Sequence, residues 1–379
     1  MKRRDGDDDE AGAEAKRSRL ESELPLASFR VDPISRFGEN ACPTYGKPIE
    51  LGAYSLDWNG AFHDDARCRK VYEPPPTEKP IAFDLSVGYD EFVSKNEDEK
   101  HYLNPILKWI RRKDAKDSAR GRKVPYDVVT WRGQLTRMMC TPYERREPWA
   151  MAATLFDGTV YVAEFETEAA RKRRREATDR MKLMCYWGRK FEDYVSRMES
   201  SGDDSTKPVN EMEAYCSVAS TKFGDIRILM SGEVDCYEKE NSNQYVELKT
   251  SRRIDREHQR RSFLKFKVIR WWAQSFLIGV PKIVCGWRDD DGIVSRLESF
   301  KTLELPRLVR DKRDMWDPTV CLNFSHRLLT WIRSVVTEDD PTMAYLIEWK
   351  PPFREVTIQP MPKHSQYTFL PDWYTRDGD

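Results

Sequence analysis

The sequence predicts a mixed fold of the α+β class for most of its 379 residues. Helical and strand patterns alternate along the chain and do not segregate into separate halves. Hydrophobic residues make up 39% of the chain, including 12 Trp, which is enough apolar surface for a large core. Residues 25–379 contain no long linker and no internal repeat, so we expect one folded domain there.

Turn and cap signals place the individual elements. The expected helices are 168–198 with a break near Thr178, 262–279 ending at Gly279, and 319–336. The expected strand pairs are 148–167 turning at Asp157-Gly158, 227–238 beside 244–251, 282–300 turning at Asp291-Gly292, and 345–360. These strands and helices are interleaved, as the fold class requires.

Composition excludes several classes of protein. Lys and Arg total 64 and Asp and Glu total 64, so a strongly basic nucleic-acid coat is absent and any polyanion site must come from local clustering. No apolar run reaches about 18 residues, and no secretory signal is visible, so we expect no membrane partner. The eight cysteines form no C-x-x-C pair, which favours reduced thiols in the nucleus or cytosol.

Residues 1–24 predict a disordered charged tail, because they lack aromatic residues and alternate blocks of opposite charge. Lys2-Arg3-Arg4 and Lys16-Arg17-Ser18-Arg19 are two basic clusters at the spacing of a bipartite nuclear import signal. A solvated tail with chance basic residues is the alternative. We expect nuclear localisation, with a cytoplasmic pool left open.

The stretch from Gly232 to Ser251 carries the chemistry. It contains Glu233-Val-Asp235 and Glu247-Leu-Lys249, on what the pattern predicts are neighbouring strands. Residues i and i+2 of a strand share one face, so three carboxylates and an ammonium would converge. That concentration of negative charge favours a bound Mg²⁺ or Mn²⁺, and such ions support hydrolysis of phosphodiesters. Each half alone is also compatible with an exposed strand face or an ordinary cross-strand ion pair.

Three other residues could complete this site. Glu192 follows Gly188 on a predicted helix and could add a carboxylate, or could simply face solvent. Gln274 lies in an apolar helix, where its amide needs partners and could hold a catalytic water. Arg132 follows an apolar strand, which suits either a phosphate clamp or a buried salt bridge.

In this order, the motifs resemble the DXO family of decapping nucleases, which includes the nuclear companions of the fungal Rat exoribonuclease. The family pattern is an Arg motif, G-x-x-x-E, E-x-D, E-x-K and a helical Gln. Stretches such as "VTWRGQLT", "YVELKTS" and "WWAQSFLIGVP" also match, and the resemblance covers roughly residues 28–375. No catalytic position of the pattern is substituted.

The resemblance implies a mixed two-sheet core with flanking helices and a D/E-x-K nuclease-like active site. It implies hydrolysis at RNA 5′ ends: removal of incomplete caps, NAD caps and 5′ triphosphates, with 5′→3′ exoribonuclease activity. The implied cofactors are two divalent metal ions, Mg²⁺ or Mn²⁺. The implied metal ligands are Glu192, Glu233, Asp235, Glu247 and the Leu248 carbonyl. Lys249 and Gln274, with Glu233 and Asp235, would act in catalysis. Arg132, Glu192, Lys249 and Gln274 would contact substrate.

Other interpretations remain open at this stage. The chain could be a non-catalytic partner that stabilises a 5′→3′ exoribonuclease, although retention of every carboxylate favours an enzyme. It could act on DNA, because a metal site does not select the sugar. The basic run Arg171–Arg175 could bind RNA phosphates or be a solvated helical face. Trp131, Trp187, Trp271 and Trp272 could stack bases, but core packing is the expected role for most of them.

Overall fold

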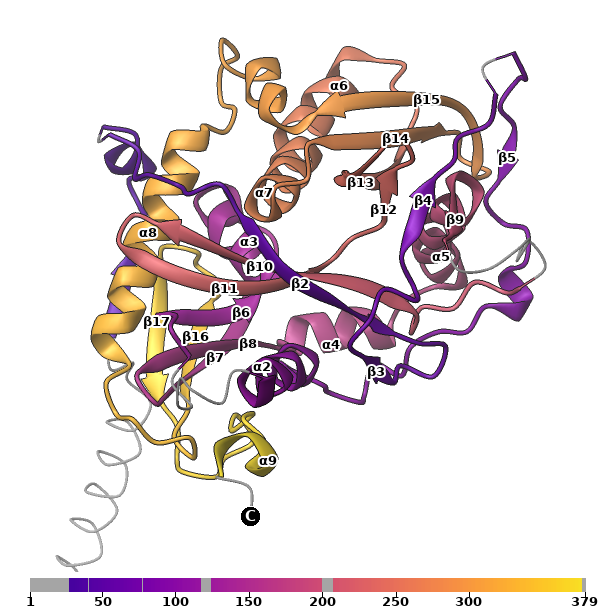
Figure 1. Cartoon of the computed structure of the whole chain (residues 1–379). Coiled ribbons are helices and arrows are strands. Elements are labelled where there is room, and N and C mark those ends of the chain that lie inside the picture. Colours follow the sequence, from indigo (N-terminus) through magenta and orange to yellow (C-terminus); the bar gives the residue numbers. More distant parts are fainter. Residues whose placement is uncertain (1–26, 40, 77, 117–123, 200–206, 377–379) are drawn as a thin grey trace, which may run out of the picture.

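The computed structural model describes residues 27–39, 41–76, 78–116, 124–199 and 207–376. Within these residues, ten strands form one sheet and seven form another, with helices around them (Figure 1). The predicted α+β class with a two-sheet core is therefore confirmed. The predicted tail, residues 1–24, lies outside the described residues.

The larger sheet, here sheet A, has the strand order β1-β17-β16-β7-β8-β6-β11-β10-β2-β3. Its strands are β1 Ala27–Arg30, β2 Ile49–Leu56, β3 Phe62–His63, β6 Val128–Trp131, β7 Trp149–Phe156, β8 Thr159–Phe165, β10 Ala214–Phe223, β11 Ile226–Glu233, β16 Tyr345–Trp349 and β17 Glu355–Pro360. The predicted hairpins of residues 148–167 and 345–360 are confirmed as β7–β8 and β16–β17. Asp157 and Gly158 both have positive φ, as a tight hairpin turn requires.

The smaller sheet, sheet B, has the order β5-β15-β14-β13-β12-β4-β9. Its strands are β4 Lys70–Tyr72, β5 Phe83–Asp84, β9 Ser196–Met198, β12 Cys236–Glu238, β13 Asn241–Arg252, β14 Lys282–Arg288 and β15 Ile293–Lys301. The predicted 282–300 hairpin is β14–β15. In the larger sheet β11 runs parallel to β6, and in the smaller sheet β13 runs parallel to β14.

The helices flank these sheets. They are α2 Asn104–Lys116, α3 Arg132–Cys140, α4 Glu168–Arg175, α5 Asp179–Val195, α6 Glu257–Ser262, α7 Ile269–Ile278, α8 Pro318–Val335 and α9 Asp372–Thr375. Short 3-10 helices cover Ile34–Phe37, Tyr89–Glu91, Thr141–Tyr143 and Thr302–Leu308. Among the described residues, no helix is both long and apolar enough to cross a membrane.

Two helix predictions need detail. The break near Thr178 is confirmed, because Thr178 caps α5 by accepting a hydrogen bond from the Met181 amide. The helix predicted for 262–279 ends at Gly279 as expected, but it begins earlier, at Glu257. Between α6 and α7 the segment Phe263–Val268 forms a π-helical turn, which the apolar periodicity did not reveal.

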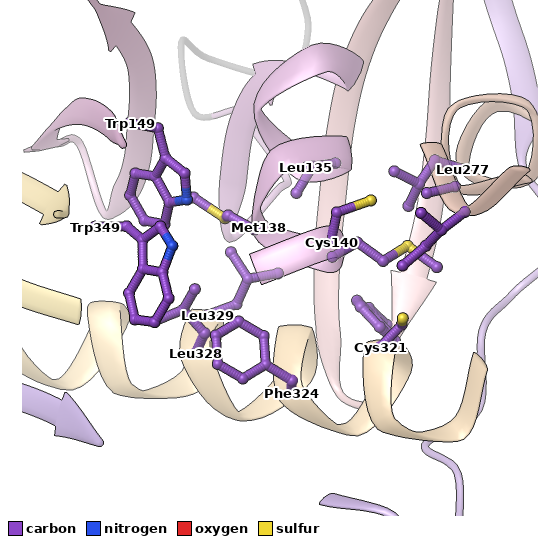
Figure 2. Close-up of a cluster of buried hydrophobic side chains, with 14 of the residues drawn as sticks. Leu135, Met138, Cys140, Trp149, Leu277, Cys321, Phe324, Leu328, Leu329 and Trp349 are labelled. Atoms are coloured by element: carbon purple, nitrogen blue, oxygen red, sulfur yellow. The ribbon is translucent and has the colours of Figure 1, made fainter. Parts of the chain in front are cut away.

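The largest hydrophobic core joins the two sheets. It combines Met151 and Val162 of sheet A with Ile283 and Cys285 of sheet B. Figure 2 shows side chains from several elements meeting in this cluster. They include Leu135 and Met138 of α3, Leu277 of α7, Phe324 and Leu328 of α8, Trp149 of β7 and Trp349 of β16. Burial of each large apolar side chain contributes about 1.5–3 kcal/mol, so α3 and α7 are firmly fixed. These two helices carry Arg132 and Gln274.

Candidate active site

The E-x-D motif lies where the chain crosses from one sheet to the other. We predicted Glu233 and Asp235 on one face of a single strand, and this is wrong. Glu233 is the last residue of β11 in sheet A, whereas Asp235 lies in the short connection to β12 of sheet B (Figure 1). Alternation ends at this crossing, because Val234 is buried and the backbone changes sheet. Asp235 instead reaches β13, where its Oδ2 accepts a hydrogen bond from the Leu248 amide at 2.6 Å.

The E-x-K motif behaves as a strand face, as predicted. Glu247 and Lys249 lie two residues apart in β13, and the Lys249 ammonium donates to Glu247 Oε1. Gln274 of α7 donates its amide Nε2–H to the same oxygen. The Arg132 guanidinium Nη1 lies 4.0 Å from Glu247 Oε2. Glu247 is only 1% exposed, so these donors stabilise a carboxylate that water barely reaches.

Glu192 and Glu233 are joined through a residue that the motif pattern does not contain. Arg189 Nη1 lies 2.6 Å from Glu233 Oε1 and 3.4 Å from Glu192 Oε2. Glu192 is held in place by α5, whose Trp187 and Phe191 are fully buried against Val246, Leu248 and Val284 of sheet B. Glu192 therefore faces the cluster and not open solvent, so the solvent-facing alternative is excluded.

Burial and mutual repulsion perturb the acids of the cluster. Burial raises the pKa of Asp235 well above its ordinary value, and the charges of Glu247 and Glu192 raise it further. Burial also raises the pKa of Glu192, against the opposing charge of Arg189. Burial acts on Glu233 in the same direction, but the charge and hydrogen bonds of Arg189 outweigh it and lower the Glu233 pKa. Burial and the proximity of the carboxylates to one another therefore disfavour the charged forms of Asp235 and Glu192 in the metal-free site.

The lysine of the cluster is held in its charged form. Burial alone would lower the pKa of Lys249, but the charges of Glu247 and Asp235 outweigh burial and raise it. At neutral pH the side chain is therefore an ammonium that can donate to water or phosphate oxygens.

Arg132 is buried, lies near Glu247 and holds the end of β11 in place. Its Nη2 donates to the Glu233 carbonyl oxygen at 2.9 Å, which fixes the end of β11. Its Nη1 is buried and makes no hydrogen bond in the structure. A buried guanidinium N–H without an acceptor is costly, so it suits an anionic ligand. The glycine at position 232 permits this approach, because a Cβ there would lie 3.0 Å from Arg132 Nε and 2.9 Å from Ile278 Cδ1.

A cleft of ≈ 1010 Å³ opens onto the cluster. Its wall includes Trp131, Arg132, Ser231, Glu233 and Gln274. A smaller cavity of ≈ 270 Å³ also contains Glu233 in its wall, together with Arg189, Glu192, Asp235 and Lys70. Glu233 therefore stands between two cavities, and ligands could approach the carboxylates from both sides.

The donor set fits divalent metal ions. The four carboxylates Glu192, Glu233, Asp235 and Glu247 come together from three segments of the chain, and hard cations prefer such oxygens. Among the described residues, no three acidic, His or Cys side chains surround one point as a finished ion cage. In the structure, Arg189 contacts Glu233 and Lys249 contacts Glu247, so cations of the chain lie against oxygens of this set.

Of the other residues considered for contact with RNA, some lie in the hydrophobic cores and some line the cleft. Trp187, Trp271 and Trp272 are buried and pack in the cores, as expected for most of them. Trp131 is half-buried in the cleft wall, where its indole N–H donates to the Tyr102 carbonyl. In the basic run, Arg174 pairs with Glu166 at 3.0 Å, and Arg173 reaches the cleft wall.

Sequence reasoning missed Arg189 and Lys70. Arg189 precedes Glu192 by three residues on a helix, and that spacing places both on one face, so it could have been found. Lys70 gave no signal, because it enters through β4, whose pairing with β12 brings distant chain segments together. Its charge acts on both Glu192 and Glu233.

Comparison with known proteins shows which family the chain is similar to. A family model described as RAI1-like PD-(D/E)XK nuclease matches residues 46–375. The decapping and exoribonuclease protein of Xenopus laevis is 41% identical over 351 residues, which cover 89% of this chain and 87% of that protein. All eight cysteines of this chain carry free thiols in the structure.

Two solved fungal structures are similar throughout. Candida albicans Rai1 in complex with pU5 and Mn²⁺ superposes with a TM-score of 0.78 at 26% identity, covering 93% of this chain and 98% of that one. Scheffersomyces stipitis Rai1 in complex with 3′-NADP⁺ and a calcium ion gives 0.77 at 25% identity, covering 89% and 92%. By sequence and by fold, the chain belongs to the family of RAI1-like PD-(D/E)XK nucleases.

Proposed function

We propose that this protein hydrolyses RNA at its 5′ end, removing incomplete caps, NAD caps and 5′ triphosphates, and then digests the RNA 5′→3′. The observation that carries the proposal is the joining of four carboxylates with Lys249, Gln274 and Arg132 beside a cleft of ≈ 1010 Å³. The relatives' names agree with it, since one is called a decapping and exoribonuclease protein.

In this proposal the carboxylates hold two divalent ions, Mg²⁺ or Mn²⁺. Glu192, Asp235, Glu247 and the Leu248 carbonyl are the direct ligands, and Glu233 binds an ion or its waters. Such ions activate water and stabilise the leaving oxygen of a phosphodiester. The solved fungal relatives contain Mn²⁺ or Ca²⁺, which supports a divalent cofactor.

The remaining residues position substrate. Lys249 and Gln274 order the nucleophilic water and the scissile phosphate, because both donors already point at the Glu247 carboxylate. Arg132 binds an RNA phosphate through Nη1, the buried donor without an acceptor. One cutting position serves several 5′ ends if the terminal group only has to fit beside the cluster. The pU5 and 3′-NADP⁺ ligands of the relatives have the chemistry of such ends.

The test is a panel of RNAs identical except for the 5′ end: triphosphate, unmethylated cap, methylated cap, NAD and monophosphate. Each is incubated with Mg²⁺ or Mn²⁺, and a DNA of matched sequence is included. We expect metal-dependent release from several RNA ends and none with Asp235→Ala, whose folding is checked by circular dichroism. Retained activity in Asp235→Ala would refute the site, and equal cleavage of the DNA would refute RNA specificity.

Two further parts of the proposal concern the cell. A 5′→3′ exoribonuclease partner needs an exposed apolar surface, and the 3-10 helix Thr302–Leu308 exposes Leu303 and Leu308. Nuclear localisation rests on the basic clusters at Lys2 and Lys16. Co-sedimentation with such an exoribonuclease, before and after Leu303→Ser, tests the first. Imaging of the chain with and without residues 1–24 tests the second.

A further inference from the structure

Arg189 is a cation inside the cluster to which the motif pattern assigns no role. It occupies the first variable position of Gly188-x-x-x-Glu192 on α5. Its Nη1 lies 2.6 Å from Glu233 Oε1 and 3.4 Å from Glu192 Oε2, and its Nη2 lies 3.4 Å from Glu233 Oε2. One guanidinium therefore links a carboxylate of α5 to a carboxylate at the end of β11.

A divalent ion would need the same oxygens. Metal–oxygen bonds to small divalent ions are about 2.0–2.2 Å long, and a guanidinium cannot remain hydrogen-bonded along the same lone pairs. Arg189 and an ion shared by Glu192 and Glu233 would therefore compete for the oxygens that Arg189 now contacts, Glu233 Oε1 above all. The other cation of the cluster differs, because Lys249 contacts Glu247 from within the E-x-K motif itself.

The neighbouring residue, Lys190, shows that a positive charge on this part of α5 does not by itself lead to contact with Glu192 and Glu233. Lys190 follows Arg189 on α5, but its ammonium pairs with Asp193 at 2.8 Å and not with Glu192 or Glu233. Both residues contribute to the wall of the ≈ 270 Å³ cavity. The cavity gives the Arg189 side chain, which is 27% exposed, somewhere to move without a shift of α5. Lys190 thus supplies a matched control of the same charge in the same cavity.

We propose that Arg189 is a displaceable internal cation. It neutralises Glu192 and Glu233 while no divalent ion is bound, and it leaves them when an ion binds. Metal binding must then break the Arg189 contacts, so the apparent metal affinity is lower than the carboxylates alone would give. Couplings of this kind are typically about 5–150-fold. The inference rests on the proposed function, because it takes Glu192 and Glu233 as metal ligands.

The experiment titrates MnCl₂ into the full chain without RNA, by calorimetry and by the paramagnetic resonance signal of free Mn²⁺. The proteins compared are wild type, Arg189→Met, Lys190→Met and Asp235→Ala. Arg189→Met is expected to bind Mn²⁺ about 5–150-fold more tightly than wild type. Lys190→Met is expected to stay within about twofold, because the Lys190 ammonium pairs with Asp193 and not with Glu192 or Glu233. If Arg189→Met does not fold, Arg189→Gln replaces it with the same expectation.

The outcomes separate this inference from the function beneath it. Suppose that wild type binds Mn²⁺ and Asp235→Ala does not. If Arg189→Met then binds Mn²⁺ no more tightly than wild type, the displaceable cation is refuted and the metal site stands. If wild type and Asp235→Ala bind Mn²⁺ alike, the carboxylates are not the metal site and both proposals fail. A Lys190→Met affinity gain as large as that of Arg189→Met would show a general charge effect and would also refute the inference.

Discussion

Glu247 is the residue on which the site depends most, because its buried carboxylate accepts hydrogen bonds from two elements and lies near a cation from a third. Lys249 shares its strand, Gln274 comes from α7, and Arg132 comes from the start of α3. Removal of one partner from a buried ion pair leaves a charge that water cannot solvate. Loss of a partner of Glu247 should therefore affect both the stability of the protein and the candidate active site.

We predict that Lys249→Met lowers the free energy of unfolding of the metal-free protein by about 2–4 kcal/mol, because Glu247 loses its ammonium partner. Urea denaturation in the presence of a chelator measures the change. The double variant Glu247→Gln/Lys249→Met removes both charges and should recover most of the loss. A single variant as stable as wild type would mean that Glu247 is solvated or protonated instead.

The raised pKa values of Asp235 and Glu192 predict how metal binding depends on pH. Both groups must lose protons to bind an ion, so Mn²⁺ affinity should rise with pH and binding should release protons. Calorimetry in buffers of different ionisation enthalpy counts the released protons. Affinity that is flat between about pH 5 and pH 8 would contradict the raised values.

The same raised pKa values have the opposite effect on the stability of the metal-free protein, which they lower as pH rises. A carboxyl whose pKa is raised by folding favours the folded state most below its unfolded pKa of about 3.9 for Asp. That contribution is lost as pH rises through the raised folded pKa. Bound Mn²⁺ should therefore increase the melting temperature more at pH 8 than at pH 5, which a thermal scan at both values can check.

At the scale of elements, α5 holds Glu192 through its packing on sheet B. The ring of Phe191 lies against Gly286 of β14, where an added Cβ would approach within 2.5 Å of it. Gly188 differs, because a Cβ added there would meet nothing within 4 Å. Gly188 and Glu192 are four residues apart, so they share one face of α5. The open space beside Gly188 thus lies on the face that carries Glu192.

We predict that Gly188→Ala stabilises the fold by about 0.5–1 kcal/mol, since alanine is the better residue inside a helix. We also expect it to lower kcat/KM on RNA, because the methyl group adds volume on the face of α5 that carries Glu192. Chemical denaturation and steady-state kinetics measure the two effects. Stabilisation with unchanged kinetics would show that substrate does not use this face.

Gly286→Ala is the matched contrast. Its Cβ would collide with the Phe191 ring, so we expect destabilisation by about 1–3 kcal/mol. Because Phe191 is adjacent to Glu192, weaker Mn²⁺ binding should accompany the loss. Denaturation and Mn²⁺ titration of the folded variant check both. If Gly286→Ala were as stable as wild type, α5 would be able to shift away from sheet B without loss of packing.

At the scale of the whole molecule, the cleft is not a basic surface. Its wall contains seven Lys or Arg residues and seven Glu residues. Several are already paired, such as Arg137 with Glu164 at 2.8 Å and Arg270 with Glu144 at 2.7 Å. Positive and negative charges therefore balance in the cleft wall, where RNA would enter, as they do in the whole sequence. Recognition has to come from the 5′ end and not from a general attraction to polyanions.

We predict a weak salt dependence of RNA binding as a result. A protein that neutralises few phosphates releases few counterions, so log K against log salt should have a slope no steeper than about −3. Fluorescence anisotropy with a 5′-triphosphate RNA and Asp235→Ala, between low and moderate salt, measures it. A slope near −6 would require basic contacts that the described cleft does not supply.

The sequence by itself predicted the fold class, many of the elements after residue 148 and the candidate residues of the site. Strand alternation, turn residues and the E-x-K spacing are local, so Glu247 and Lys249 share a face as expected. Only the tertiary structure decided how the pieces meet. Local spacing cannot reveal that the E-x-D motif spans a crossing between sheets, because that depends on which strands pair. It likewise cannot show that Arg189 bridges Glu192 to Glu233, since α5 and β11 meet only through packing.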